Sequence, residues 1–352
     1  MNDRLAGVLL GTAVGDALGL PAEGLSPSRR RRMMPGPWRQ RFLLGRGMIS
    51  DDTEHALFVA QSLLKHPDNA VAFQRCLAWH LRLWFAGLPA GIGLATARAC
   101  IKLWLGVPPT SSGVFSAGNG PAMRSAVIGA YFQNDSRAID EFVLASTRLT
   151  HTDPRAATAA LAVAHLAAWA VRHDASQPPS ADFVAERLFQ IAPEDQEWNR
   201  LVNRIQAAFS TGRSVADFAA SLGLQKGVTG YAYHTVPVAV FAWLRHYGDF
   251  RGTLTAALDC GSDADTVGAI VGALAGATVG AGAIPDEWLR GVVDWPRSIG
   301  LLRKVVDRLN QQQQQGRVLG PVRYAWLAIL PRNVFFLLVV LAHGCRRLAP
   351  PY

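Results

Sequence analysis

The sequence predicts an all-α protein, a compact multi-helix domain followed by an apolar and basic helical tail. Apolar side chains recur at helical spacing through most of the chain, and no segment forms a convincing strand. With 352 residues, of which 50% are hydrophobic, the chain can bury a large core. The composition is that of a globular protein.

The first predicted helix covers residues 5–20 and has glycine along one face. Four glycines recur at four-residue spacing: Gly7, Gly11, Gly15 and Gly19. Such a face permits very close packing, and the segment is too short to span a membrane, so we expect a buried helix in which Asp16 needs a partner. Residues 21–47 contain four prolines and are predicted to be a long irregular loop that delivers Glu23.

Apolar periodicity predicts most of the remaining helices. We expect them over residues 51–64, 70–85, 91–105, 139–149, 156–171, 183–191, 197–209, 214–222, 234–247, 250–258 and 267–283. A glycine- and serine-rich loop over residues 108–121 follows the third of these. Its backbone donors could hold an anion, although a plain connection is the commoner role of such a loop.

A boundary is predicted after Leu309. It divides the chain into a domain at residues 1–309, a glutamine-rich linker at 310–316 and a tail at 317–352. The uninterrupted apolar part of the tail, residues 334–342, is too short to span a bilayer, but its flanking arginines suit an interfacial helix. We weigh equally that the tail docks back onto the domain and that it rests peripherally on a membrane or a partner.

The formal net charge of +9 is compatible with phosphate-bearing partners. Much of the charge lies in the run Arg29–Arg32 and in the tail. No aromatic residues are interleaved with the run, so we favour a solvated loop and find no specific nucleic-acid motif. Four widely spaced cysteines argue against a zinc ribbon or a disulfide framework, and the N-terminus does not read as a secretory leader. We therefore expect a cytoplasmic monomer.

Two acidic clusters stand at predicted helix starts. Asp263 and Asp265 lie beside Thr266, with Ser262 as the expected cap, and the upstream stretch Ser50-Asp51-Asp52-Thr53 repeats this chemistry. Crowded carboxylates repel one another, and their oxygens suit Mg²⁺, Ca²⁺ or Mn²⁺ rather than zinc. If the fold joins the clusters, two ions about 3.5 to 4 Å apart become plausible. Otherwise the acids serve only as helix-start residues.

Six ordered motifs resemble the ADP-ribosylglycohydrolase family over roughly residues 4–298. They are Gly11-Thr-Ala-Val-Gly-Asp-Ala-Leu-Gly19 with Glu23, Ser50-Asp-Asp-Thr53, Gly118-Asn-Gly-Pro-Ala-Met-Arg124, Thr150-His151, Gly230-Tyr231 with His234-Thr-Val-Pro237, and Ser262-Asp-Ala-Asp-Thr-Val-Gly268. The tail after Leu309 matches nothing in the family pattern.

The resemblance implies two Mg²⁺ ions, with Mn²⁺ as a substitute, between two helix starts. The residues that match the ligands are Ser50, Asp51, Asp52, Asp263, Asp265 and Thr266. The candidates for moving the proton are Glu23, Asp51 and Asp265. The residues that match the ADP-ribose pocket are Ser116, Gly118, Asn119, Gly120, His151 and Tyr231.

The implied activity is hydrolysis of the glycosidic bond between ADP-ribose and an acceptor. The acceptor is a protein side chain such as arginine or serine, a nucleic-acid end or a free metabolite. The alternative is a non-catalytic module of the same fold that binds ADP-ribose or blocks a toxin and is tethered by its tail. Both ligand triplets are intact, which favours the enzyme. Because the predicted linker separates the tail from every motif, truncation after Leu309 is expected to leave hydrolysis of a small substrate nearly unchanged.

Overall fold

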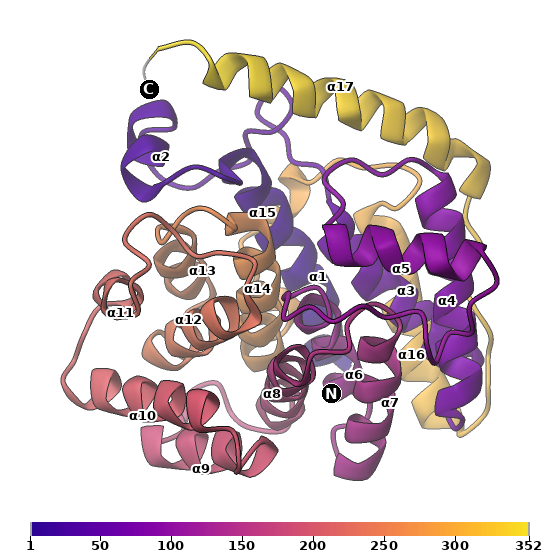
Figure 1. Cartoon of the computed structure of the whole chain (residues 1–352), viewed down its shortest axis with the longest axis horizontal. Coiled ribbons are helices and arrows are strands. Elements are labelled where there is room, and N and C mark those ends of the chain that lie inside the picture. The colour runs from indigo at the N-terminus through magenta and orange to yellow at the C-terminus, as the bar shows by residue number, and fades with distance from the viewer. Residues whose placement is uncertain (1, 351–352) are drawn as a thin grey trace.

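The computed structural model describes residues 2–350, which form seventeen α-helices and no named β-strand (Figure 1). The helices are α1 (Asn2–Gly19), α2 (Pro27–Met33), α3 (Asp51–Lys65), α4 (Ala70–Ala86), α5 (Leu94–Trp104), α6 (Ala126–Tyr131), α7 (Ser136–Arg148), α8 (Pro154–Ala170), α9 (Ala181–Ile191), α10 (Gln196–Ser210), α11 (Val215–Ser221), α12 (Ala232–Arg245), α13 (Phe250–Leu258), α14 (Ala264–Val279), α15 (Asp286–Gly291), α16 (Ile299–Gln315) and α17 (Ile329–Arg347). The predicted all-α fold is confirmed. The last two residues of the predicted tail, 351–352, lie outside the described range.

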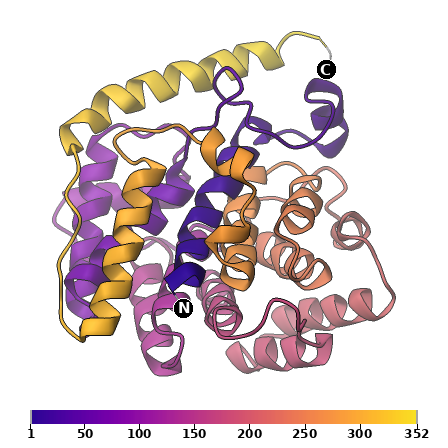
Figure 2. The same ribbon diagram turned by 180° about the vertical axis from the view of Figure 1, so that it is seen from behind.

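Helix α1 is buried at the centre of the molecule, where it contacts α3, α6, α14 and α16 (Figure 2). It runs antiparallel to α14 in a contact lined with glycine. A Cβ atom on Gly15 would lie 1.9 Å from the carbonyl oxygen of Gly268, and one on Gly11 would lie 2.1 Å from that of Gly272. The close packing predicted from the glycine spacing of α1 is therefore present. It also fixes the start of α14 beside the end of α1.

The predicted loop over residues 21–47 contains a short helix, α2, which is a correction to the sequence analysis. Ser26 caps this helix, because its side chain accepts a hydrogen bond from the backbone N–H of Arg29. The arginine run is not simply solvated either. Arg30 is buried, with its guanidinium carbon 3.9 Å from the ring centroid of Trp38 and its Nη1 3.4 Å from Asp259 Oδ1.

The predicted linker at residues 310–316 is wrong, because α16 continues through the glutamine run and ends at Gly316 in the left-handed conformation. Gln312 is buried, and its Nε2 donates to the carbonyl oxygen of Leu63 at 3.0 Å and to the hydroxyl of Tyr131 at 2.9 Å. The low-complexity composition suggested a flexible segment. Specific polar partners in the fold hold it as a helix.

Two helical segments in the described part of the chain are long and apolar enough to cross a membrane. The first, residues 3–22, is 94% buried and is a core helix. The second, residues 326–347, is only 17% buried. It includes α17, which lies along one edge of the molecule in both ribbon views (Figures 1 and 2).

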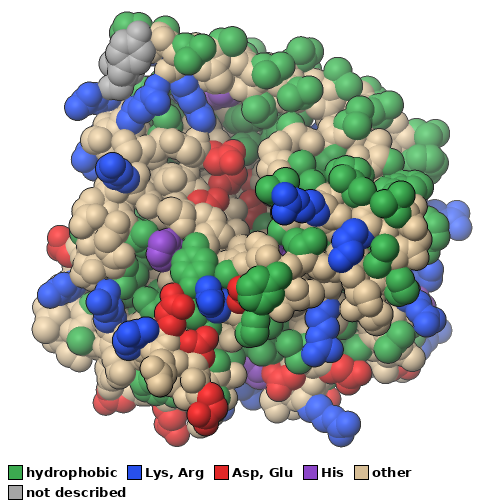
Figure 3. Space-filling view, in the orientation of Figure 1, with side chains coloured by type: hydrophobic (Ala, Val, Ile, Leu, Met, Phe, Trp, Pro, Cys, Tyr) green, Lys and Arg blue, Asp and Glu red, His purple; other side chains and the backbone are tan. Residues whose placement is uncertain are grey.

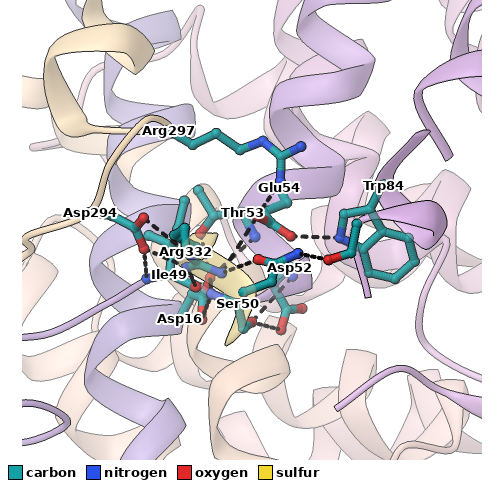
Figure 4. A network of polar contacts seen from close by, with 12 residues as sticks. Asp16, Ile49, Ser50, Asp52, Thr53, Glu54, Trp84, Asp294, Arg297 and Arg332 are labelled. Carbon is teal, nitrogen blue, oxygen red and sulfur yellow. Dashed lines mark hydrogen bonds and ion pairs between the residues drawn. The ribbon is translucent and has the colours of Figure 1, made fainter. Parts of the chain in front are cut away.

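Helix α17 docks onto the domain, which was one of the two predicted roles of the tail. Arg332 is the main contact: its Nε donates to Asp294 Oδ1 at 3.0 Å, and its Nη1 lies 3.7 Å from Glu54 Oε1 (Figure 4). Glu54 also pairs with Arg297 and accepts a hydrogen bond from Trp84 Nε1. This buried network joins α17 to the first turn of α3, so the tail is not separate from the motifs.

We expect truncation after Gly316 to destabilise the domain, an effect that the sequence-based expectation about hydrolysis did not include. Cutting after Gly316 keeps Gln312 but removes Arg332, so Asp294 becomes a buried carboxylate without its cation. Breaking a buried ion pair in this way costs roughly 3 to 5 kcal/mol. Thermal unfolding of the full and truncated chains measures the effect, and an unchanged Tm after the cut would contradict the docking role of α17.

Candidate active site

The starts of α3 and α14 meet at the floor of one cavity of about 350 Å³. The two acidic clusters, which are more than two hundred residues apart in sequence, are linked by a hydrogen bond from Thr266 Oγ1 to Asp52 Oδ2 at 3.3 Å. Asp51, Asp263 and Asp265 line the cavity directly, together with Glu23, Ser50 and Thr266. Acidic side chains are visible in a hollow of the molecular surface (Figure 3).

The first cluster is organised by Asp16 from α1. This buried carboxylate accepts hydrogen bonds from the backbone N–H groups of Ser50, at 2.9 Å, and Thr53, at 3.2 Å. Ser50 is the N-cap of α3, and its hydroxyl oxygen accepts from the N–H of Asp52. The expected partner of Asp16 is therefore the start of α3. Sequence analysis quoted Asp16 in a motif but gave it no role at the site.

The second cluster begins at a strained backbone position. Ser262 has φ of +66°, an uncommon conformation for a residue other than glycine, and such residues concentrate at functional sites. Its N–H donates to the carbonyl oxygen of Leu25, and the N–H of Asp263 donates to that of Val228. The expectation that Ser262 caps the helix is wrong, because Asp263 occupies the N-cap position. Two loops therefore hold the backbone that aims Asp263 and Asp265 at the cavity.

Burial and mutual repulsion raise the pKa values of this carboxylate cluster. Burial is the largest cause throughout, and it raises the pKa of Asp16 and Asp263 to about 6. Asp51, Asp52 and Asp265 have pKa values well above the ordinary range, because neighbouring carboxylates add to the effect of burial. Among the described residues none of these five acids forms a salt bridge, although the charges of Arg332, Arg124 and Arg347 act on Asp16, Asp51 and Asp265 from a greater distance. A positive charge there would be strongly favoured.

The donor atoms fit a hard divalent cation. Asp52 Oδ1 is buried without a hydrogen-bond partner, whereas the hydroxyls of Ser50 and Thr266 both donate to Oδ2 of the same carboxylate. The oxygen-only set suits Mg²⁺ or Mn²⁺. Among residues 2–350, no three Asp, Glu, His or Cys side chains already converge on a single point. Several of the carboxylates are instead turned toward N–H and O–H donors, as with Asp263 and Asn119.

One wall of the cavity is the predicted glycine-rich loop. Four predicted pocket residues from it line the cavity: Ser116, Gly118, Asn119 and Gly120. The glycines leave room for His151, because a Cβ atom on Gly118 would lie 2.9 Å from His151 Nε2. Asn119 Nδ2 donates to Thr235 Oγ1 at 2.9 Å and to Asp263 Oδ2 at 2.5 Å. The loop is therefore tied directly to the acidic cluster.

Tyr231 lies differently from the other predicted pocket residues. Its hydroxyl donates to Glu197 Oε1 at 2.8 Å, and its ring packs edge-on against His234. At this point the cavity is lined by the neighbouring Gly230. The backbone of Tyr231 still contributes, because it pairs with Gly118 in an isolated β-bridge.

Sequence reasoning missed Arg124 as a support of the site, although it ended one of the quoted motifs. Arg124 is fully buried, and its guanidinium donates to Ser146 Oγ at 3.0 Å and to Thr150 Oγ1 at 2.9 Å. Thr150 Oγ1 in turn lies 2.8 Å from His151 Nδ1. Arg124 therefore fixes the corner that carries His151.

The contribution of α17 to the site was also missed. Phe336 and Val340 of this helix line the cavity together with the glycine-rich loop. At the mouth, loss of surrounding water raises the pKa of Glu23, and the positive charge of Arg347 opposes this rise. No family motif covers the tail, so only the folded arrangement reveals that α17 forms part of the cavity wall.

We expect His151→Ala to raise KM and to spare kcat, with His151→Phe milder than His151→Ala. Burial, together with the nearby charge of Arg124, lowers the pKa of His151 to about 3, so its ring is neutral at pH 7 and serves as a wall. Loss of a wall weakens substrate and transition state alike. Steady-state kinetics at saturating substrate provide the measurement, with His165→Phe in α8 as the control. A large fall in kcat for His151→Phe would assign the imidazole nitrogens a chemical role.

The fold and the site define an all-α protein whose cavity floor consists of two acidic helix starts. The family model for ADP-ribosylglycohydrolase matches residues 1–318. The chain belongs to this family, and it is thus a glycohydrolase of the class that acts on ADP-ribosylated substrates.

Individual relatives agree with this assignment. The chain is 32% identical over 307 residues to an uncharacterised protein of Archaeoglobus fulgidus, an alignment that covers 84% of this chain and 93% of the relative. It is 29% identical over 300 residues to the ADP-ribosyl-[dinitrogen reductase] glycohydrolase of Rhodospirillum rubrum, an alignment that covers 82% of this chain and 90% of the relative. The solved structure of an ADP-ribosylglycohydrolase-related protein complex matches with a TM-score of 0.66 and 30% sequence identity. The match covers 88% of this chain and 98% of the solved chain.

Proposed function

We propose that the protein is a Mg²⁺-dependent hydrolase that cleaves the glycosidic bond between ADP-ribose and its acceptor, and so reverses ADP-ribosylation of a protein side chain or a related conjugate. The observation that carries the proposal is the meeting of two acidic helix starts around Asp52, whose Oδ1 is buried without a partner. Membership of the ADP-ribosylglycohydrolase family supports the class of substrate.

Six residues would hold two Mg²⁺ ions, for which Mn²⁺ could substitute. They are Ser50, Asp51, Asp52, Asp263, Asp265 and Thr266. When bound, the ions would neutralise the crowded acids, orient the ribose diol and lower the pKa of water. Asp16 keeps the start of α3 in place through its backbone hydrogen bonds, and Asn119 keeps Asp263 aimed at the cavity.

The remaining side chains of the cavity suit cleavage at the anomeric carbon. Such a bond breaks through a cation-like state, which nearby carboxylates stabilise, and the departing acceptor needs a proton. Glu23, Asp51 and Asp265 all line the cavity. We assign the proton to Glu23, because its side chain is exposed on the segment after α1, whereas Asp51 and Asp265 are among the six residues that would hold the ions.

Release of ADP-ribose from defined conjugates tests the proposal. The purified full chain is incubated with arginine-modified peptide, serine-modified peptide and an ADP-ribosylated nucleic-acid end, each with Mg²⁺ or with EDTA. We expect release from at least one conjugate with Mg²⁺ and none with EDTA. Binding of ADP-ribose without any release would favour the non-catalytic alternative. Release that persists in EDTA would contradict the metal requirement.

We expect Mg²⁺ to stabilise the protein more as the pH rises. Asp16 and Asp263 have folded-state pKa values of about 6, above the ordinary value of about 3.9, so their contribution to stability is lost as pH rises through about 6. A bound cation would offset this loss. The Tm difference between Mg²⁺ and EDTA, measured from about pH 5 to about pH 8, should therefore increase. A difference independent of pH would contradict the coupling.

A further inference from the structure

Helix α17 has two apolar faces, only one of which is covered. The inner face includes Ile329 and Phe336, which are buried. The outer face carries six large apolar side chains, each between 42% and 60% exposed: Leu330, Val334, Phe335, Leu337, Leu338 and Leu341. Their spacing gives a continuous stripe along a helix about 28 Å long. A contiguous apolar surface of this kind marks a contact with another apolar phase.

The apolar surface continues beyond the helix. Trp326, at the start of the same segment, is 62% exposed, and so is Trp295 in the neighbouring loop. Trp295 and Phe335 line one shallow apolar cavity, so the loop and the helix share a surface. Apolar side chains follow the upper edge of the space-filling view, over α17 (Figure 3). Exposed tryptophan beside an apolar stripe is typical of residues at a membrane interface.

A basic region adjoins the C-terminal end of this stripe. A cavity of about 630 Å³ is lined there by five arginines: Arg39, Arg41, Arg46, Arg346 and Arg347. Glu287 also lines this cavity, but it is paired with Arg251. A further arginine, Arg29 of α2, donates a hydrogen bond to the backbone of Arg347. Basic side chains gather near this end of α17 in Figure 3, and residues 308–352 contain no Asp or Glu.

We propose that α17 and the adjoining arginine cavity bind the surface of an anionic membrane, with the apolar stripe in the interface and the arginines on lipid headgroups. An apolar helix face flanked by basic residues has this chemistry. A second copy of the chain suits the surface less well, because its α17 segment contributes no acidic side chain to pair with the arginines. This inference does not rest on the proposed hydrolase activity.

The contacts of α17 with the domain indicate that it lies flat on the membrane rather than across it. Asn333 Nδ2 donates to the carbonyl oxygen of Gly87 at 2.7 Å, and Arg332 is held by Asp294. Ten residues further on, His343 Nε2 lies 2.7 Å from the carbonyl oxygen of Phe42. Spanning a bilayer would break these contacts near both ends. An interfacial position keeps them and still covers the outer face.

Vesicle flotation of the full chain tests the proposal, with phosphatidylcholine vesicles and with vesicles that also contain phosphatidylglycerol. We expect binding to the anionic vesicles and at least about tenfold less to the neutral ones. Leu338→Glu should reduce binding about tenfold or more, because it places a charge in the apolar stripe. The double variant Arg39→Gln, Arg346→Gln should remove the preference for anionic vesicles.

Val71→Glu is the matched control, because Val71 is 53% exposed in the first turn of α4, at the end of that helix away from α17. It should bind vesicles like the unchanged chain, and all variants should keep the same unfolding midpoint. Absence of vesicle binding, or equal loss in Leu338→Glu and Val71→Glu, would overturn the proposal. The proposal would also be overturned if sedimentation showed that the unchanged chain is a dimer and that Leu338→Glu dissociates it. In that case a second copy of the chain would cover the stripe.

Discussion

Asp52→Asn and Asp263→Asn are each expected to lower kcat by at least about 10³-fold while the helical fold remains. Each variant removes one of the carboxylates that would hold Mg²⁺. A catalytic cation contributes several kcal/mol of transition-state stabilisation, and each 1.36 kcal/mol is a factor of ten in rate. In EDTA the variants should be as stable as the unchanged protein or more so, because a buried repulsion is relieved.

The measurement is kcat on the conjugate that the unchanged protein hydrolyses, together with the Tm in EDTA. Asp140→Asn is the control, because Asp140 is an exposed acid on α7 that pairs with His165 outside the acidic cavity. It should retain full activity. If either site variant keeps kcat within tenfold of the unchanged protein, that carboxylate takes no part in the reaction.

Gly15→Ala is expected to disrupt the fold itself. The added Cβ would lie 1.9 Å from the carbonyl oxygen of Gly268, so two buried backbones would have to separate. Overpacking of a core costs roughly 1 to 3 kcal/mol and occasionally more. For Gly15→Ala we expect a loss of stability at the upper end of this range or beyond it, because both sides of the contact are backbone. The expected readout is a strongly lowered Tm or no folded protein.

Gly344→Ala is the matched control for this substitution. Gly344 also lies inside a helix, α17, but a Cβ atom there would meet nothing within 4 Å. Replacing it should be neutral or stabilise the protein by up to about 1 kcal/mol through helix propensity. Equal Tm values for Gly15→Ala and Gly344→Ala would contradict the role of the glycine contact between α1 and α14.

Much of the fold could be predicted from local patterns. Apolar periodicity identified most helices, and the glycine spacing in α1 predicted a close helix contact. It did not identify the partner, although Gly268, Gly272 and Gly276 of α14 repeat the same spacing. The glutamine run at the end of α16 was misread for a physical reason. Its helix depends on long-range hydrogen bonds such as those of Gln312, which composition does not encode.

In the site, too, local patterns predicted some features, and others depend on long-range contacts. Sequence found the acidic clusters, because hydroxyls and paired acids before apolar runs are a local signal. Their meeting depends on α1, which packs against both α3 and α14: Asp16 binds the start of α3, and Gly19 lies beside the start of α14. The wall contributed by Phe336 was not predictable, because an apolar tail has no signal for the surface on which it docks.

Calorimetric titration of Mg²⁺ into the metal-free protein tests most directly whether the starts of α3 and α14 form the metal site of a hydrolase. The predicted result is binding of two ions to the unchanged protein and to Asp140→Asn, with at least one ion lost in both Asp52→Asn and Asp263→Asn. No Mg²⁺ binding by the unchanged protein, or the same titration in both site variants, would contradict the assignment.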